Sequence, residues 1–276
     1  MAVFTEPKID CHVHVLDPAR FAYQPDTRYR PAGQEIATAA QLTSVCQIYG
    51  IAHCLVVGPN SGYGSDNRCL VDAIVGSAGR FKGIAVVGND VSERDLLRLR
   101  SGGVVGIAIN PSLNGVDYYR GFGRLVAMLA AHELFLQVQT EKDQLLDLLA
   151  LFERSAVRVL VDHCGRPDVS AGVDAPAFQA LLALGRSGRA AVKISGLQKF
   201  SAMPHPYPDT WPFIRALVAA FGLDHCVWGS DWPFLKATER LDYGPLLGLA
   251  AELFPDPADR RKLWWETPLR LFGFAR

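Results

Sequence analysis

The sequence has 276 residues, with 28 basic and 28 acidic side chains and a formal net charge of zero. This balance argues against a nucleic-acid binder or a polybasic membrane-surface protein, since both depend on an excess of positive charge. The length fits either two ordinary domains or one large α/β barrel of roughly 250 residues. The longest apolar runs, such as 125–131, fall far short of the ~20 residues that cross a bilayer.

Six cysteines are spread along the chain, and none forms a C-x-x-C pair. Several of them lie inside apolar runs. The N-terminal segment has no basic region followed by a long apolar stretch, which a secretory signal would have. We therefore expect reduced, mostly buried thiols in a cytoplasmic protein, and no zinc finger.

Short β-branched or apolar runs recur at even intervals along the chain. Most of these runs are continuous rather than alternating, which is typical of strands buried on both faces, as in a parallel sheet. The predicted strands are 9–15, 53–57, 83–87, 104–109, 135–139, 157–161, 191–194 and 226–228.

Segments with apolar residues three and four positions apart fill the gaps between the strands. The predicted helices are 34–49, 92–100, 118–132, 142–152, 178–184, 213–221, 246–254 and 257–272. Eight strands alternating with helices, without a Pro/Ser-rich linker, predict an α/β protein with one (β/α)8 TIM-like barrel domain over 1–276 and C-terminal helices. A doubly wound open sheet is the alternative, although no glycine-rich nucleotide-binding motif occurs.

In a (β/α)8 barrel the chemistry lies at the carboxyl ends of the strands. The first predicted strand carries His12 and His14 there, and their i, i+2 spacing places both side chains on one face. Two such imidazoles can chelate one metal or donate hydrogen bonds to one oxyanion. The alternative is that either ring is a core side chain, but each would then need a buried partner of its own.

The sixth predicted strand runs into the segment VDHCGRPD, which places His163 at the strand end and Arg166 in the following loop. A guanidinium group suits a substrate carboxylate. It equally suits a structural salt bridge, for example with Asp162 or Asp168. Both interpretations of Arg166 stay open at this point.

The eighth predicted strand runs into the segment VWGSDWP, which ends in an apolar Trp-Pro pair after Asp231. We expect this carboxylate to be partly buried and therefore to need a partner, for which histidines of neighbouring strands are the obvious candidates. The alternative is that Asp231 caps a following helix.

With H-x-H after the first strand, His163 after the sixth and Asp231 after the eighth, the chain resembles the amidohydrolase superfamily. The segments VDHCGRPD and VWGSDWP resemble a narrower group of 2-pyrone-4,6-dicarboxylate lactonases and sugar-lactone hydrolases. The resemblance covers nearly the whole chain.

This resemblance implies hydrolysis of a lactone inside a distorted TIM barrel. Asp231 would be the general base that takes a proton from the attacking water. His12, His14 and His163 would polarise the lactone carbonyl and stabilise the oxyanion, directly or through a metal. If a single Zn²⁺ or other divalent metal is bound, these three histidines and Asp231 would be its ligands. The group resembled works without a metal, so we expect no required cofactor.

The chain departs from the family pattern in two places. Metal-dependent members add a Lys, Glu or His from the fourth or fifth strand, where this chain offers Asn110, Gln137 and Gln139. Pyrone-dicarboxylate lactonases carry arginines after the fourth strand, where Ala108 and Asn114 stand here. Losing an arginine opposite a substrate carboxylate is a large change, because charge-assisted hydrogen bonds are the strong ones. A less acidic or more hydroxylated lactone would therefore suit this loop better.

Further substrate-binding candidates lie in the predicted loops at the barrel mouth. These candidates are Tyr29, Arg30, Asn60, Ser61, Gln139, Arg166 and Lys199. A solvated surface position is the alternative for Tyr29, Arg30, Asn60, Ser61 and Lys199. Since the chain has no net charge, an anionic substrate would have to be recognised by a few local groups of this kind.

Two other functions stay open. A metal-dependent decarboxylase of an aromatic or dienoic acid is similar in its barrel and in its H-x-H motif, and a stoichiometric Zn²⁺ or Mn²⁺ would favour it. A non-catalytic ligand-binding barrel would bind a lactone without turnover. The expected partner is a small-molecule lactone or carboxylic acid, with no nucleic acid and no membrane, and the chain is expected to be a monomer or a homodimer.

Overall fold

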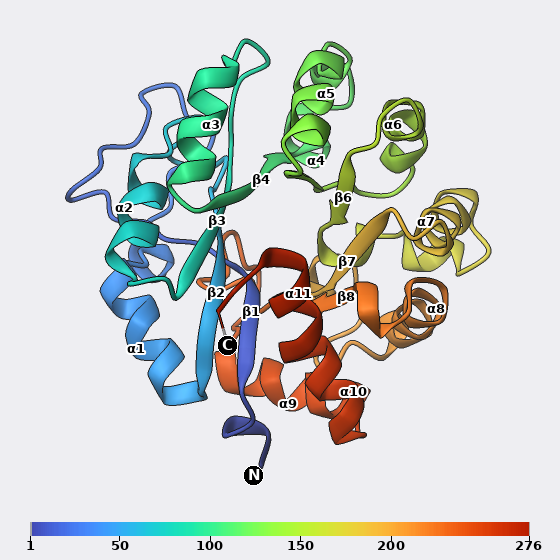
Figure 1. Cartoon of the computed structure of the whole chain (residues 1–276). Coiled ribbons are helices and arrows are strands. Elements are labelled where there is room, and N and C mark those ends of the chain that lie inside the picture. Colours follow the sequence, from blue (N-terminus) through green and yellow to red (C-terminus); the bar gives the residue numbers. More distant parts are fainter. Residues whose placement is uncertain (1, 276) are drawn as a thin grey trace. The chain divides into compact units, whose positions relative to one another are not determined.

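The computed structural model describes residues 2–275. Eight strands follow one another in chain order in a single sheet, and helices alternate with them (Figure 1). The strands are β1 (Lys8–Val13), β2 (Ile51–Val57), β3 (Phe81–Ala85), β4 (Val104–Ile109), β5 (Phe135–Val138), β6 (Arg158–Val161), β7 (Ala190–Ile194) and β8 (Cys226–Trp228). This alternation confirms the predicted (β/α)8 TIM-like class.

The helices differ more from the prediction than the strands do. The helices are α1 (Ala39–Tyr49), α2 (Arg68–Gly76), α3 (Glu93–Ser101), α4 (Pro111–Asn114), α5 (Gly123–Ala131), α6 (Gln144–Glu153), α7 (Pro176–Arg186), α8 (Trp211–Phe221), α9 (Tyr243–Leu253), α10 (Pro257–Arg261) and α11 (Thr267–Phe272). Helices α2 and α4 were not predicted. Helix α1 begins later than predicted because Thr38 caps it, its hydroxyl accepting a hydrogen bond from the Gln41 N–H.

The chain divides into two compact units. The first unit comprises Met1–Gly88, Arg94–Val105 and Trp228–Arg276, and the second comprises Asn89–Glu93 and Gly106–Val227. The assignment of a single domain over 1–276 stays a prediction.

The core of the first unit is built on β1, β2 and β3, which pair in parallel. Every residue of β1 is buried. Helix α1 packs against β2, and α2 packs against β2 and β3 (Figure 1). Beyond α10, a π-helical turn η9 (Lys262–Glu266) leads into α11, and both contact β1. The C-terminal helices therefore close the core around the strand that carries the H-x-H motif.

In the second unit, β5 pairs in parallel with β4 and β6, and β6 pairs with β7. Helices α7 and α8 pack against β7 and against each other. Gly185 permits this approach, because a Cβ atom there would lie 2.3 Å from the Phe221 ring. The close packing fixes β6 and β7, whose ends carry the polar residues of this unit.

All six cysteines are free and buried, as the prediction of reduced, buried thiols requires. Cys46 on α1 and Cys54 on β2 bring their sulfur atoms to 3.3 Å from each other. Among residues 2–275, no helix combines the length and apolar character needed to cross a membrane.

Candidate active site

The first unit gathers His12, His14 and Asp231 into one buried cluster. The Nε2 atoms of both histidines lie 3.5 Å from Oδ1 of Asp231. The two rings meet edge to face, with their centroids 5.0 Å apart. The side chains of His12 and Asp231 are 2% exposed and that of His14 is 10% exposed, so only the His14 side of the cluster meets solvent appreciably.

Backbone hydrogen bonds between β1 and the segment after β8 build this cluster. The Asp231 N–H donates to the carbonyl of His12, and the His14 N–H donates to the carbonyl of Trp232, both at 2.8 Å. Asp231 has a φ of 65°, in the left-handed region. Gly229 allows the approach, since a Cβ atom there would lie 2.7 Å from the Cβ of His12.

Asp10 also joins β1 to the segment after β8, through hydrogen bonds of its carboxylate. Its Oδ1 accepts hydrogen bonds from the backbone N–H groups of His12 and Ser230, and its Oδ2 accepts one from the Tyr243 hydroxyl at 2.7 Å. Burial raises the pKa of Asp10, and the hydrogen bonds from Ser230 and Tyr243 oppose that rise. The sequence reasoning did not single out Asp10, although an aspartate two residues before H-x-H in an apolar strand was the available signal.

The hydrogen bond of His14 defines its tautomer. Its Nδ1 lies 2.8 Å from the carbonyl oxygen of Val57, and a carbonyl can only accept. Nδ1 therefore carries the hydrogen, and in the neutral ring Nε2 is an acceptor. His14 Nε2 and the Asp231 carboxylate thus place two acceptors side by side.

The same cluster fits a divalent metal. One ligand atom from each of His12, His14 and Asp231 lies within 4.8 Å of the others. Two imidazoles and a carboxylate are a common protein ligand set for Zn²⁺. These three residues of the first unit therefore fit a divalent metal ion such as Zn²⁺.

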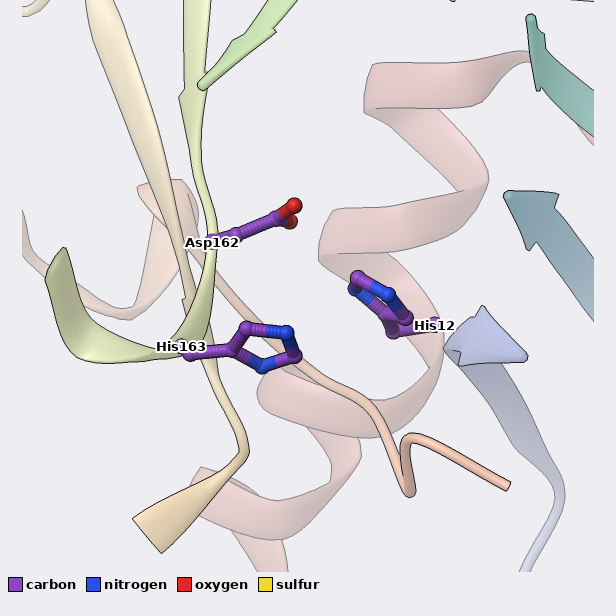
Figure 2. A group of neighbouring side chains, drawn as sticks. All are labelled: His12, Asp162 and His163. Atoms are coloured by element: carbon purple, nitrogen blue, oxygen red, sulfur yellow. The ribbon is translucent and has the colours of Figure 1, made fainter. Parts of the chain in front are cut away.

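The second unit carries His163 directly after β6, beside Asp162 (Figure 2, which also labels His12 at β1). His163 is 1% exposed, and its Nδ1 lies 3.0 Å from the Ser195 hydroxyl. The backbone is left-handed at His163, Cys164 and Arg166, with φ values of 50°, 57° and 46°. Each such residue costs ~1–2 kcal/mol relative to the right-handed form, and strain of this kind concentrates at functional sites.

A buried ionic triangle lies just before His163. Lys193 Nζ lies 3.0 Å from Oδ1 of Asp162 and donates to Oε1 of Gln137 at 2.6 Å. Gln137 Nε2 in turn donates to Oδ2 of Asp162 at 2.7 Å. All three side chains are at most 2% exposed. Sequence reasoning missed Lys193, for which the signal was a lysine inside the apolar strand β7.

Two of the loop candidates of the second unit, Arg166 and Gln139, contact other polar side chains of that unit. Arg166 donates to Oε2 of Glu141 at 2.9 Å, so its salt bridge is with Glu141 and not with either aspartate suggested by the sequence. The Nε of Arg166 is buried and has no hydrogen-bond partner among the described residues. Gln139 lies 3.4 Å from both the Asn110 amide and the Ser112 hydroxyl. Lys199 is half-buried at the end of the short helix η6 (Leu197–Lys199).

The loop candidates of the first unit lie on the segments that follow β1 and β2. The Tyr29 hydroxyl donates to the Glu35 carboxylate at 2.6 Å, and this bond raises the pKa of Tyr29 to about 12. Arg30 is exposed and donates to the carbonyl of Pro25 at 2.8 Å. Asn60 and Ser61 are half-buried in the loop after β2.

Residues 9–274 match the model of a protein family described as amidohydrolase. Among curated proteins, the chain is 30% identical to a 2-pyrone-4,6-dicarboxylate hydrolase of Comamonas testosteroni, over 96% of this chain and 89% of that protein. It is also 30% identical to a 4-sulfomuconolactone hydrolase of Rhizobium radiobacter, over 96% and 89% of the two chains.

Solved structures show the same fold. A probable 2-pyrone-4,6-dicarboxylic acid hydrolase from Acinetobacter baumannii superposes with a TM-score of 0.88 at 24% identity, covering 97% of this chain and 99% of that one. An amidohydrolase from Burkholderia multivorans with bound zinc superposes with a TM-score of 0.75 at 20% identity, covering 97% and 99%. These findings confirm the resemblance seen in the motifs, and the chain belongs to the amidohydrolase family.

Proposed function

We propose that the chain is a hydrolase that opens a lactone ring, with Asp231 as the general base. The observation that carries this proposal is the buried cluster in which one Asp231 carboxylate oxygen lies 3.5 Å from Nε2 of both His12 and His14. The two curated relatives above, both named as lactone hydrolases, supply the class of substrate. A general base must be unprotonated to accept a proton, as an ordinary aspartate is at neutral pH.

In this mechanism Asp231 and His14 hold the attacking water. The carboxylate and the neutral Nε2 of His14 are two acceptors for the two hydrogens of one water molecule. The water oxygen attacks the lactone carbonyl carbon while Asp231 takes its proton. His12 and His163 are proposed to polarise the carbonyl oxygen and to stabilise the oxyanion. The ring C–O bond then breaks, and the departing oxygen recovers the proton from Asp231 to give an alcohol or enol and a carboxylic acid.

His163 enters this proposal through its position in the fold. It directly follows β6, and catalytic groups of (β/α)8 enzymes come from the carboxyl ends of several strands. Its left-handed backbone supports a functional role, because such strain is retained where the surrounding structure over-determines it.

A divalent metal would be held by His12, His14 and Asp231. When bound, it would supply Lewis-acid polarisation of the carbonyl and would lower the pKa of a bound water. The need for such a metal is tested by elemental analysis of the purified protein together with activity measured after dialysis against a chelator. A stoichiometric Zn²⁺ or Mn²⁺ whose removal abolishes turnover would overturn the metal-free form of the proposal.

We further propose that the lactone is hydroxylated and carries few carboxylates. The loops after β4 and β5 present the uncharged side chains of Asn110, Ser112, Asn114 and Gln139, hydrogen-bonded among themselves or with Tyr119. Arg166 is already paired with Glu141, which lowers the positive charge available to a substrate carboxylate. Neutral amides and hydroxyls suit substrate hydroxyl groups better than a dicarboxylate.

The test is a hydrolysis assay over pyrone, muconate-type and sugar-acid lactones. We expect turnover of at least one sugar-acid lactone, with Asp231→Asn lowering kcat by ~100–10,000-fold, since general base catalysis contributes about that much. Asp256→Asn is the matched control, because Asp256 caps α10 and asparagine caps equally well. Full activity of Asp231→Asn would refute the assigned base, and turnover of only the pyrone dicarboxylate would refute the substrate preference.

A further inference from the structure

Ser195 follows β7 and lies against the imidazole of His163. Its hydroxyl oxygen is 3.0 Å from Nδ1 of His163, and the two residues are 2% and 1% exposed. Among the described residues, this ring nitrogen is the one hydrogen-bond partner of the Ser195 hydroxyl. The direction of this single bond decides which nitrogen of the His163 ring carries the hydrogen.

The burial of the hydroxyl sets that direction. If the ring donated to Ser195, the hydroxyl hydrogen would be buried without an acceptor, at a cost of about 1–3 kcal/mol. If Ser195 donates to Nδ1 instead, both groups are satisfied. A neutral imidazole has one donor and one acceptor nitrogen, so an Nδ1 that accepts leaves the hydrogen on Nε2.

We propose that Ser195 is a positioning residue that holds His163 in the tautomer with hydrogen on Nε2. His163 then presents a hydrogen-bond donor to the carbonyl oxygen, a role that rests on the proposed lactone hydrolysis. His14 is held in the opposite tautomer, because the Val57 carbonyl accepts from its Nδ1. The two histidines therefore differ in function: His14 accepts from the water, and His163 donates to the carbonyl.

The orientation of the His163 ring has a second support in Gly196. A Cβ atom at this position would lie 2.5 Å from Nδ1 and 2.7 Å from Cγ of His163, and Gly196 has a φ of 62°. The His163 ring therefore packs directly against the backbone of the loop that follows β7. Lys193, on the strand that leads into this loop, is bonded to Asp162, the residue before His163. The loop and the ring are thereby fixed to each other.

The direct test is ¹⁵N NMR of the purified protein labelled at histidine, with the His163 signals assigned through a His163→Asn variant. We expect the pattern of a neutral ring protonated at Nε2. In Ser195→Ala we expect a mixture of tautomers, and in Ser195→Thr the wild-type pattern. A wild-type ring protonated at Nδ1 would overturn the proposal, and this spectrum alone decides the direction if Ser195→Ala does not fold.

The kinetic test uses the lactone turned over by the wild type. We expect Ser195→Ala to lower kcat about tenfold with little change in KM, less than the ~100–1,000-fold lost when an oxyanion donor itself is removed. Ser195→Thr should restore kcat, and Ser155→Ala, which removes a hydroxyl bond at the end of α6, should match the wild type. An unchanged kcat in Ser195→Ala would overturn the positioning role. If no lactone is hydrolysed but the ring is protonated at Nε2, the proposed function fails while the tautomer assignment stands.

Discussion

Replacing Lys193 by methionine removes one charge from the buried triangle of Lys193, Asp162 and Gln137 while keeping an unbranched side chain of similar length. The change eliminates the 3.0 Å ion pair with Asp162 and the 2.6 Å hydrogen bond to Gln137. The carboxylate stays buried without its ammonium partner. Breaking a buried pair from one side costs about 3–5 kcal/mol, so we expect the free energy of unfolding to fall by that amount.

A double-mutant cycle with Asp162→Asn isolates the ion pair, because neither charge remains in the double variant. We expect each single variant to lose about 3–5 kcal/mol and the double variant to lose much less than their sum, since replacing both buried charges is often close to neutral. The measurement is urea unfolding followed by circular dichroism. Arg20→Met is the control, because the Arg20–Asp72 pair is shorter, at 2.7 Å against 3.0 Å, but is 59% and 41% exposed, and such pairs contribute ~0–1 kcal/mol. Additive losses in the double variant, or equal losses at Lys193 and Arg20, would refute the reasoning.

Two further predictions concern pH and thiol chemistry. The hydrogen bond from Arg260 lowers the pKa of Glu6 below its ordinary value of 4.5. The stabilisation is therefore complete above that value and is lost as pH falls through the folded-state pKa. Glu6→Gln should lower the free energy of unfolding by about 1 kcal/mol at pH 7 and by less near pH 3.5; a difference independent of pH would contradict this. Burial raises the pKa of Cys164 to about 12, and all six thiols are buried, so an aromatic disulfide reagent should react with them only as fast as the protein unfolds. A rapid reaction of even one thiol in the native protein would show that its burial is incomplete.

The strands were predictable because most of them are continuous apolar runs bounded by turn residues. The runs 104–109 and 226–228 have the same bounds in the sequence prediction and in the structure. Helix α2 was missed although four of its nine residues, Cys69, Leu70, Ala73 and Ile74, are buried at the three- and four-residue spacing of one helix face; its Asn67 N-cap position makes no side-chain cap bond. The predicted helix 257–272 is interrupted by the π-helical turn before Pro268, whose missing N–H cannot continue the regular pattern.

The site was predictable where local spacing decides it. Alternation along one strand put His12 and His14 on the same face, and Asp231 followed from the end of another strand. The partners of His163 and Lys193 were not predictable, because Ser195 and Gln137 lie 32 and 56 residues away from them in the chain. Their contacts depend on which strands become neighbours and on the register between them, and no local pattern encodes either. The sequence also left open whether Tyr29 and Arg30 bind substrate. In the structure both side chains form hydrogen bonds within their own loop, which no local pattern encodes.

The backbone bonds between β1 and the segment after β8 join parts of the chain that are synthesised far apart in time. The bond from the Ser230 N–H to Asp10 joins residues 220 positions apart. At roughly 5–20 residues per second, a ribosome needs about 10–40 s between making the two partners. Throughout that interval the H-x-H strand has emerged without the carboxylate that completes its cluster. A nascent chain stalled before Asp231 would therefore hold both histidines without the proposed general base, so under the proposed mechanism hydrolytic activity should arise only once almost all of the polypeptide has been made.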